Sequence, residues 1–314
     1  MNSKWMRQCF PAIVFVALGI GCLPPARAQG QVGSKGIESI EVIERPKAPA
    51  DKATAVANPR RHVTYRSAKP FSKRPPAAGA EYAKLGVTIW RLQQTVGAKG
   101  MEQQGEEAQL EQVEASQELS VGSAVRIGVE SLGHDGFLYV VDREQFADGT
   151  YGVPLLIFPT LKTRQGNNHV RAHQLVLIPR PPSYFKINPS STGKKQVAEV
   201  LTLIVSPTPL AVPALGDKAI TLSGALFKSW ETRWSAPVNT LEMEGGAGQT
   251  VPVETQIVGS KSLDQEGAEP EQLTDNDPLP QTVYRLTIKR GASLLVTVPL
   301  RFQTVAAPGG KKKP

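Results

Sequence analysis

Cysteine is almost absent from this sequence. Two cysteines occur among its 314 residues, and both, Cys9 and Cys22, lie close to the N-terminus. If residues 1–28 are removed, the remaining chain has no disulfide, no thiolate-ligated metal and no cysteine nucleophile. We therefore expect a hydrophobic core alone to stabilise the fold.

The N-terminal region also lacks an apolar run long enough to span a membrane. The apolar run at residues 12–20 is well short of the roughly 20 residues that a bilayer requires. It follows the basic residues Lys4 and Arg7, and a small-x-small sequence ends at Ala28. This layout predicts a secretory signal peptide, and hence a mature chain that is periplasmic or secreted and has no transmembrane span. A lipoprotein anchored through Cys22 is the alternative, because the residues before it loosely resemble a lipidation box.

Sequence signatures of catalysis are missing too. The chain has no G-x-S-x-G elbow and no H-E-x-x-H motif. Its glycine-rich stretch at 245–250 lacks the lysine of a phosphate-binding loop, which indicates a flexible turn. We therefore expect no catalytic residues, no cofactor and no bound metal, and we interpret the protein as non-enzymatic.

The alternative that we keep is a metal-dependent hydrolase near His169, His173 and Asp148. The two histidines are four residues apart, a spacing that suits metal ligands on one face of a helix. Here they run into a predicted strand, where four residues span about 13 Å, too far for a single ion. Carboxylates from the neighbouring segment, Asp142, Glu144 or Asp148, would have to complete such a site.

The same acidic segment permits two weaker interpretations. Asp142 and Glu144 resemble the carboxylate pair of a glycosidase, but the intervening Arg143 favours a solvated loop. Asp148 suits a calcium ligand, but the twelve-residue calcium-loop pattern is missing. We therefore expect residues 142–151 to form a polar surface loop.

Positive charge is concentrated near the ends of the chain. The net charge is +8, and residues 29–80 are rich in Pro, Ala, Lys and Arg but poor in large apolar residues. Such a segment cannot bury enough surface to offset its ordering entropy, so we expect a disordered basic tether. Residues 306–314 form a second basic tail. The tether fits a solubilising spacer, and the alternative is that it attracts an anionic envelope polymer. Nucleic acid is the less favoured partner, because aromatic residues are not interleaved with the basic ones.

Glycine and proline are abundant, with 28 and 26 residues, and favour short strands joined by turns. Apolar residues alternate at period two, most clearly as Val125, Ile127 and Val129. This pattern predicts strands at 85–92, 124–130, 137–141, 153–159, 174–179, 200–205, 283–288 and 294–302. The turns at 133–136 and 289–292 predict that the strands on either side of each turn pair as hairpins.

Prolines and composition indicate the role of other segments. Proline near both ends of 153–159, and Pro299 in the last strand, predict positions at a sheet edge or strand end. Residues 97–119 fit either a loop or a frayed helix. The acidic segment 263–280 is a predicted surface loop.

One amphipathic helix is predicted after residue 223. Its apolar residues Leu226, Phe227, Trp230 and Trp234 follow each other at helical steps, and Ser223 is placed to cap it. We expect both tryptophans to bury against the strands. The alternative is an exposed aromatic platform for a ligand.

These elements predict a mostly β protein. The fold class is an antiparallel β-sandwich, immunoglobulin-like in general architecture, with one short amphipathic helix and a disordered N-terminal tether. We divide the chain into a signal peptide (1–28), the tether (29–80), a sandwich domain (81–210), a helix and C-terminal hairpin that extend the sandwich (211–305), and the tail (306–314).

Four stretches of the block 119–207 carry a family resemblance: Gly122-Ser-Ala-Val-Arg-Ile-Gly-Val-Glu-Ser, Gly136-Phe-Leu-Tyr-Val-Val-Asp-Arg-Glu, Leu156-Ile-Phe-Pro and Asn168-His-Val-Arg-Ala-His. The block resembles a bacterial family known only as a domain of unknown function, number four-three-eight-four of that series. The flanks 86–92 and 277–285 look like its longer members. The resemblance implies an exported or envelope-associated β-rich module, with no reaction and no established binding residues. His173 stands where the family usually has glycine.

Three functions remain open on the sequence alone. The first is a non-catalytic exported sandwich that binds another envelope protein or an anionic envelope polymer through exposed edges or the segment 142–152. The second is the metal-dependent hydrolase already described. The third is a structural assembly subunit, and the sequence does not indicate an oligomeric state.

Overall fold

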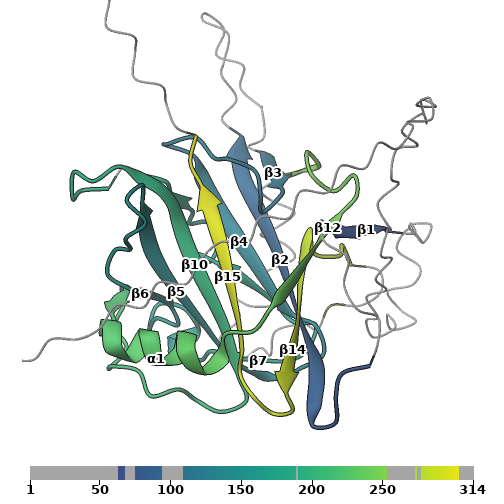
Figure 1. The fold of residues 1–314 in the computed structure, drawn as a ribbon. Helices are drawn as coiled ribbons and strands as arrows, with labels where there is room; N and C mark the ends of the chain where they lie inside the picture. Colours follow the sequence, from purple (N-terminus) through teal and green to yellow (C-terminus); the bar gives the residue numbers. More distant parts are fainter. Residues whose placement is uncertain are drawn as a thin grey trace, which may run out of the picture. The chain divides into compact units, whose positions relative to one another are not determined.

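Two antiparallel sheets form most of the described part of the chain (Figure 1). The structure is a computed structural model that describes residues 63–67, 75–93, 109–188, 190–252, 273 and 277–303. All of them belong to one unit, Ile37–Pro314. The predicted fold class, mostly β and sandwich-like with one helix, is confirmed.

The larger sheet, sheet A, is organised around the long strand β2 (Ala80–Gln93). One edge of β2 pairs with β14 and then β3, and the other edge pairs with β4. Beyond these strands lie β12 and β1 on one side, β13 beside β3, and β8 and β9 beside β4. The remaining bounds in sheet A are β1 (Tyr65–Ser67), β3 (Gln109–Val113), β4 (Ala124–Ser131), β8 (Leu175–Ile178), β9 (Phe185–Lys186), β12 (Val238–Met243), β13 (Thr250–Pro252) and β14 (Thr282–Lys289).

The smaller sheet, sheet B, has the order β11–β6–β5–β10–β15, and β7 also pairs with β5. Its strands are β5 (Gly136–Phe146), β6 (Leu155–Phe158), β7 (His169–Val170), β10 (Gln196–Ser206), β11 (Ile220–Thr221) and β15 (Leu294–Arg301). A short 3₁₀ turn, η1 (Arg164–Gly166), precedes β7.

The core lies between the inner faces of the two sheets, as the period-two pattern predicted. Val125, Ile127 and Val129 of sheet A share one buried cluster with Leu138 and Val140 of sheet B. The opposite face of β4 is buried as well, including its charged residues. Arg126 is 0% and Glu130 2% exposed, since the segment 171–184 covers that face. The alternation of apolar residues therefore predicted the strand, but it did not predict that another segment covers the face of Arg126 and Glu130.

The predicted hairpin of 124–130 with 137–141 is wrong. β4 lies in sheet A and pairs with β2 over seven residue pairs, whereas β5 lies in sheet B and pairs with β10 over ten. The predicted turn region connects one sheet to the other, and Gly133 takes a φ of 116° there. β4 pairs with β2, which is longer than β5, and β5 pairs with β10, which is longer than β4. Each strand therefore has a longer partner than the predicted hairpin would provide.

The predicted C-terminal hairpin is wrong for the same reason. β14 pairs with β12 and β2 in sheet A, and β15 pairs with β10 in sheet B. The turn at 289–292 exists, with Gly291 at a φ of 71°, but it passes between the sheets. Pro299 lies on an edge strand, which confirms that part of the prediction.

Two predicted irregular segments contain strands. Residues 142–146 continue β5 because they pair with β10, so the polar loop is confined to the residues that follow. Within the predicted tether, Tyr65–Ser67 forms β1 on β12, and the Tyr65 side chain is 1% exposed. Its hydroxyl donates to the carbonyl of Pro280 at 2.6 Å, which holds this segment on the sheet. The disordered-tether prediction is therefore wrong for these residues.

Several predictions fall outside the described residues. They concern residues 1–28, the range 29–62 of the tether, most of 263–280 and the tail 306–314. Of the segment left open at 97–119, residues 109–113 form β3. In the glycine-rich stretch, Gly245 and Gly248 have φ values of 69° and 79°, as a turn requires.

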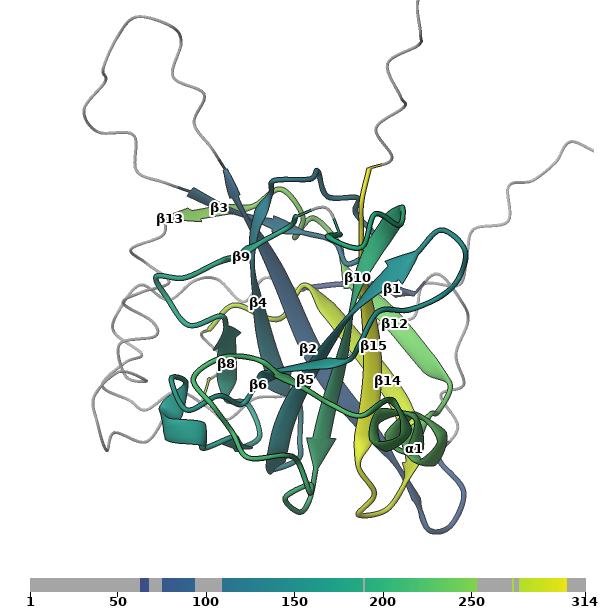
Figure 2. The same cartoon turned by 90° about the vertical axis from the view of Figure 1, so that its left-hand side faces the viewer.

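The single α-helix, α1 (Gly224–Trp234), begins as predicted. The Ser223 hydroxyl accepts a hydrogen bond from the Leu226 amide at 3.1 Å and so caps the helix. Phe227 and Trp230 pack on Tyr139, Val141 and neighbouring apolar residues of the outer face of sheet B. Figure 2 shows α1 nearly end-on beside β15. No helix of the described ranges is long and apolar enough to cross a membrane.

Candidate functional site

A groove of about 880 Å³ lies beside α1. Its walls come from three segments that are far apart in sequence: residues 206–211 after β10, residues 226–236 of α1 and its C-terminus, and residues 287–293 at the turn between β14 and β15. This volume lies within the range of ligand pockets. Each of these three segments lies at the end of a strand of one of the two sheets or shortly after it. The sandwich therefore fixes the position of the groove.

Two tryptophans form its aromatic wall. Trp230 and Trp234 are one helical turn apart, and their rings stack at 6.2 Å with an interplanar angle of 24°. Trp230 is 6% exposed and belongs to the cluster under α1, as the sequence predicted. Trp234 is only partly buried and lines the groove. The helix therefore buries Trp230 fully and Trp234 in part, and the predicted ligand platform stays a prediction.

The wall opposite α1 is fixed by hydrogen bonds and prolines. The Leu210 amide donates to the Tyr139 hydroxyl of β5 at 2.8 Å, which attaches this segment to sheet B. At its other end, the Ser293 hydroxyl donates to the Ser206 hydroxyl at 3.0 Å in a buried contact. Pro207 and Pro209 restrict the backbone between these points. The groove is therefore preformed along this side.

The charges that line the groove are all positive. Arg233 projects from α1, with its guanidinium carbon 5.9 Å from the centre of the Trp234 ring. Lys289 lines the groove from the end of β14. Both side chains are exposed, and no Asp or Glu of the described residues lines the groove. An anionic ligand would therefore meet two cations without a competing carboxylate.

A second chemical cluster joins strands β5 and β10. Asp142 and Glu199 carry carboxyl groups that hydrogen-bond each other, and Glu144 lies opposite Glu199 in the register. Burial raises the pKa of Asp142 to about 8, and the charges of Glu199 and Glu144 add to this shift. Burial also raises the pKa of Glu199, whose Oε1 accepts from Gln196 Nε2 at 2.7 Å.

The raised pKa of Asp142 and the burial of both carboxyl groups favour a proton held between them. Asp142 Oδ1 and Glu199 Oε2 are buried, and no described donor reaches them. A proton held between the two groups supplies the missing donor. The glycosidase interpretation paired Asp142 with Glu144, whereas the side-chain interaction of Asp142 is with Glu199 of β10. The predicted solvated loop is wrong here, because Asp142 lies on a strand.

The structure does not bring together the residues of the proposed metal site. His169 pairs with Phe137 at the start of β5, and Asp148 follows the far end of this eleven-residue strand. At about 3.3 Å per residue, the two lie some 30 Å apart along the strand. No group of three His, Cys, Asp or Glu within the described ranges is arranged to hold a metal.

His173 instead has a local structural role. Its Nδ1 lies 3.4 Å from Glu130 Oε1 on β4, and its carbonyl accepts from the Leu273 amide at 2.7 Å. Its φ of 62° lies in the left-handed region that favours glycine. The contacts with Glu130 and Leu273 hold the histidine in this conformation.

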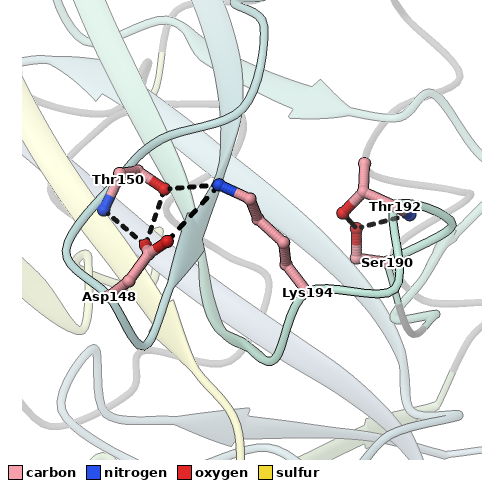
Figure 3. A network of polar contacts seen from close by, with 5 residues as sticks. All are labelled: Asp148, Thr150, Ser190, Thr192 and Lys194. Carbon is pink, nitrogen blue, oxygen red and sulfur yellow. Dashed lines mark hydrogen bonds and ion pairs between the residues drawn. The ribbon is translucent and has the colours of Figure 1, made fainter.

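Asp148 belongs to a surface network between two turns (Figure 3). Its Oδ1 accepts from the Thr150 amide at 2.8 Å and the Thr150 hydroxyl at 2.6 Å. Lys194 Nζ lies 3.3 Å from Asp148 Oδ2 and 3.2 Å from the Thr150 hydroxyl. The hydrogen bonds from Thr150 are the main reason that the pKa of Asp148 is lowered. These contacts occupy both carboxylate oxygens and stabilise the turn after β5.

The sequence predicted the aromatic wall of the groove but not its other two walls, residues 206–211 and 287–293. Arg233 was not singled out, and Lys289 was assigned only to a turn. Their positions depend on β14 and β15 belonging to different sheets, which local patterns did not reveal. The one sequence signal for the groove was the helix face with two tryptophans, for which burial and a ligand platform were the two predictions.

No family model, curated protein or solved structure matches this chain. The resemblance to family four-three-eight-four therefore stays a prediction.

Proposed function

We propose that this chain is a non-catalytic, exported module that binds another envelope protein through the groove beside α1. The observation that carries the proposal is the preformed groove, which combines a partly exposed tryptophan with two exposed cations. Tryptophan and arginine are the residues most often found at the centre of protein interfaces. The signal-peptide layout of residues 1–28 supports export, and the absence of catalytic sequence signatures supports a binding role.

The other candidate functions have less support. The hydrolase depended on His169, His173 and Asp148, which do not meet. The exposed loop of the first hypothesis is shorter than expected, because half of 142–152 is strand. The anionic-polymer alternative depends mostly on the basic range 29–80, of which only a small part is described.

Photo-crosslinking in intact cells tests this function. A benzophenone amino acid replaces Ser229, which lines the groove, in the full-length chain. We expect an ultraviolet-dependent adduct with a discrete envelope protein that mass spectrometry identifies, because a partner in the groove lies against this side chain. Adding Trp234→Ala should remove the adduct.

The matched control places the same crosslinker at Thr232, which is exposed on the same helix but does not line the groove. Identical adducts at both positions, or none at Ser229, would contradict the proposal. Turnover of a substrate by the purified chain, abolished by a point substitution, would contradict its non-catalytic part.

A further inference from the structure

We propose that the groove takes an extended acidic segment of the partner, in which an aliphatic or proline anchor stands next to Asp or Glu. This inference rests on the proposed protein-binding function and adds the chemistry of the partner. It is carried by two features of the same cavity, an apolar slot and a pair of cations at its rim.

The apolar slot is the part of the groove that apolar side chains line, and it offers a surface to a hydrophobic side chain of the partner. Leu226 and Trp234 of α1, Leu210 of the fixed segment and Ile288 of β14 all line it. A partner side chain that enters the slot removes apolar surface from water, which stabilises binding by about 25 cal/mol per Å². Grooves lined by aromatic residues are also a common site for extended proline-containing segments.

The two cations define the charge of the neighbouring partner residues. Arg233 and Lys289 approach from different elements, and no ion pair of the described residues involves either one. A carboxylate between or beside them forms charge-assisted hydrogen bonds without first breaking an existing ion pair. A partner lysine or arginine at the same place would be repelled. The rim therefore discriminates by charge and the slot by shape.

The fixed walls favour an extended peptide. The segment 206–211 is attached at both ends, and α1 is packed on sheet B through Phe227 and Trp230. Binding then requires little ordering of the groove itself, so more of the contact energy appears as affinity. A uniformly anionic polysaccharide would satisfy the cations but would make no use of the apolar surface that Leu226 and Trp234 present to the groove. The peptide is therefore the occupant that both features favour.

Selection from a displayed library of random short peptides tests this chemistry. The bait is the purified chain without residues 1–28. We expect enriched peptides to combine Asp or Glu with Pro, Leu, Ile or Val. Their binding should weaken as salt rises, because the ion pairs are at the surface.

Charge reversal provides the decisive comparison. The double variant Arg233→Glu/Lys289→Glu should lose the acidic peptides by about tenfold or more and select Lys- and Arg-containing peptides instead. Trp234→Ala should weaken binding of peptides of either charge. Lys186→Glu is the matched control, since this exposed lysine on β9 lies outside the groove, and it should leave the selection unchanged.

The outcomes separate the inference from the proposed function. Selected peptides without acidic enrichment, or unchanged selection by the double variant, overturn the inference. If the crosslinking at Ser229 still identifies a protein, the binding function stands. Polygalacturonate that displaces the selected peptides and binds more tightly per site identifies an acidic polysaccharide as the occupant and also overturns the inference. Failure of both the selection and the crosslinking contradicts the function itself.

Discussion

At the scale of single residues, the carboxyl pair of Asp142 and Glu199 is the main departure from the sequence-based interpretation. The two residues are 57 positions apart in the chain, and the β5–β10 register brings them together on the inner face of sheet B. Asp142 followed a run of apolar residues and was therefore assigned to the next loop. No local pattern indicates that a strand continues through Asp, Arg and Glu, because pairing with β10 and β6 determines it.

Replacing Asp142 with Asn should stabilise the fold more at high pH than at low pH. The folded-state pKa of about 8 lies above the unfolded value of about 3.9, so the folded protein retains a proton that the unfolded chain has lost. The stabilisation from this proton is full below about pH 4 and is lost as pH rises toward 8. Urea denaturation at pH 5 and pH 9 measures the effect, with an expected gain of up to a few kcal/mol at the higher pH.

Glu144→Gln is the comparison variant for this experiment, and its gain at pH 9 should be smaller, because it removes a repulsive charge near Asp142 but leaves the interaction of Asp142 with Glu199 in place. Glu144 is on the same strand and faces the same side, but does not hydrogen-bond with Glu199. Burial also raises the pKa of Glu242, to about 7, so the stability of the wild type itself depends on pH. The quantity to compare is therefore the difference in the free energy of unfolding between variant and wild type at each pH. An equal gain at both pH values would show that Asp142 is ionised in the folded state.

At the scale of elements, the sequence predicted where strands lie better than how they pair. Period two identified β4 and β8 nearly to the residue, and the Ser223 cap located α1. The predicted pairings of β4 with β5 and of β14 with β15 were wrong, because a turn reverses the chain equally well within a sheet or between two sheets. The choice depends on which distant strands compete, and that information is not local.

Replacing Pro299 with Val should make the protein self-associate. Pro299 lies on β15, whose outer edge pairs with no named strand in the described part of the chain and is bridged only at its C-terminal end, where Leu119 contacts Arg301 and Phe302. Proline offers no N–H there, and valine would restore a donor on an exposed strand edge. We expect a concentration-dependent rise in mass, measured by size-exclusion chromatography with light scattering.

Thr297→Val controls for added hydrophobicity in this experiment. Thr297 is exposed two residues earlier on the same strand and already has its N–H. If both variants associate equally, surface apolarity is responsible and the missing donor is not.

At the scale of the whole molecule, strands from the two proposed regions 81–210 and 211–305 interleave. β14 lies between β12 and β2, and β15 covers an edge of β10. The groove depends on the same arrangement, because its third wall is the passage from β14 to β15. Its location was therefore not predictable from any one segment, although the Trp230 and Trp234 helix indicated one wall.

A fragment of residues 81–210 should fail to fold. It lacks the eight residue pairs that β14 makes with β2 and the eight that β15 makes with β10. Core residues such as Leu85 and Leu203 would then be exposed along two sheet edges. Circular dichroism and thermal melting should show no cooperative transition, whereas residues 63–303 should melt in a single step. Cooperative melting of the shorter fragment would mean that the regions are independent domains.

The pairing of β2 with β14 also determines when the native structure can be completed. A ribosome makes Ala80 some two hundred residues before it makes the last residue of β14, and until then β2 has one edge without its partner. The nascent chain therefore remains incompletely folded through most of its synthesis. If the chain is exported as proposed, a secretion channel that admits only extended polypeptide can capture it before its sheets close.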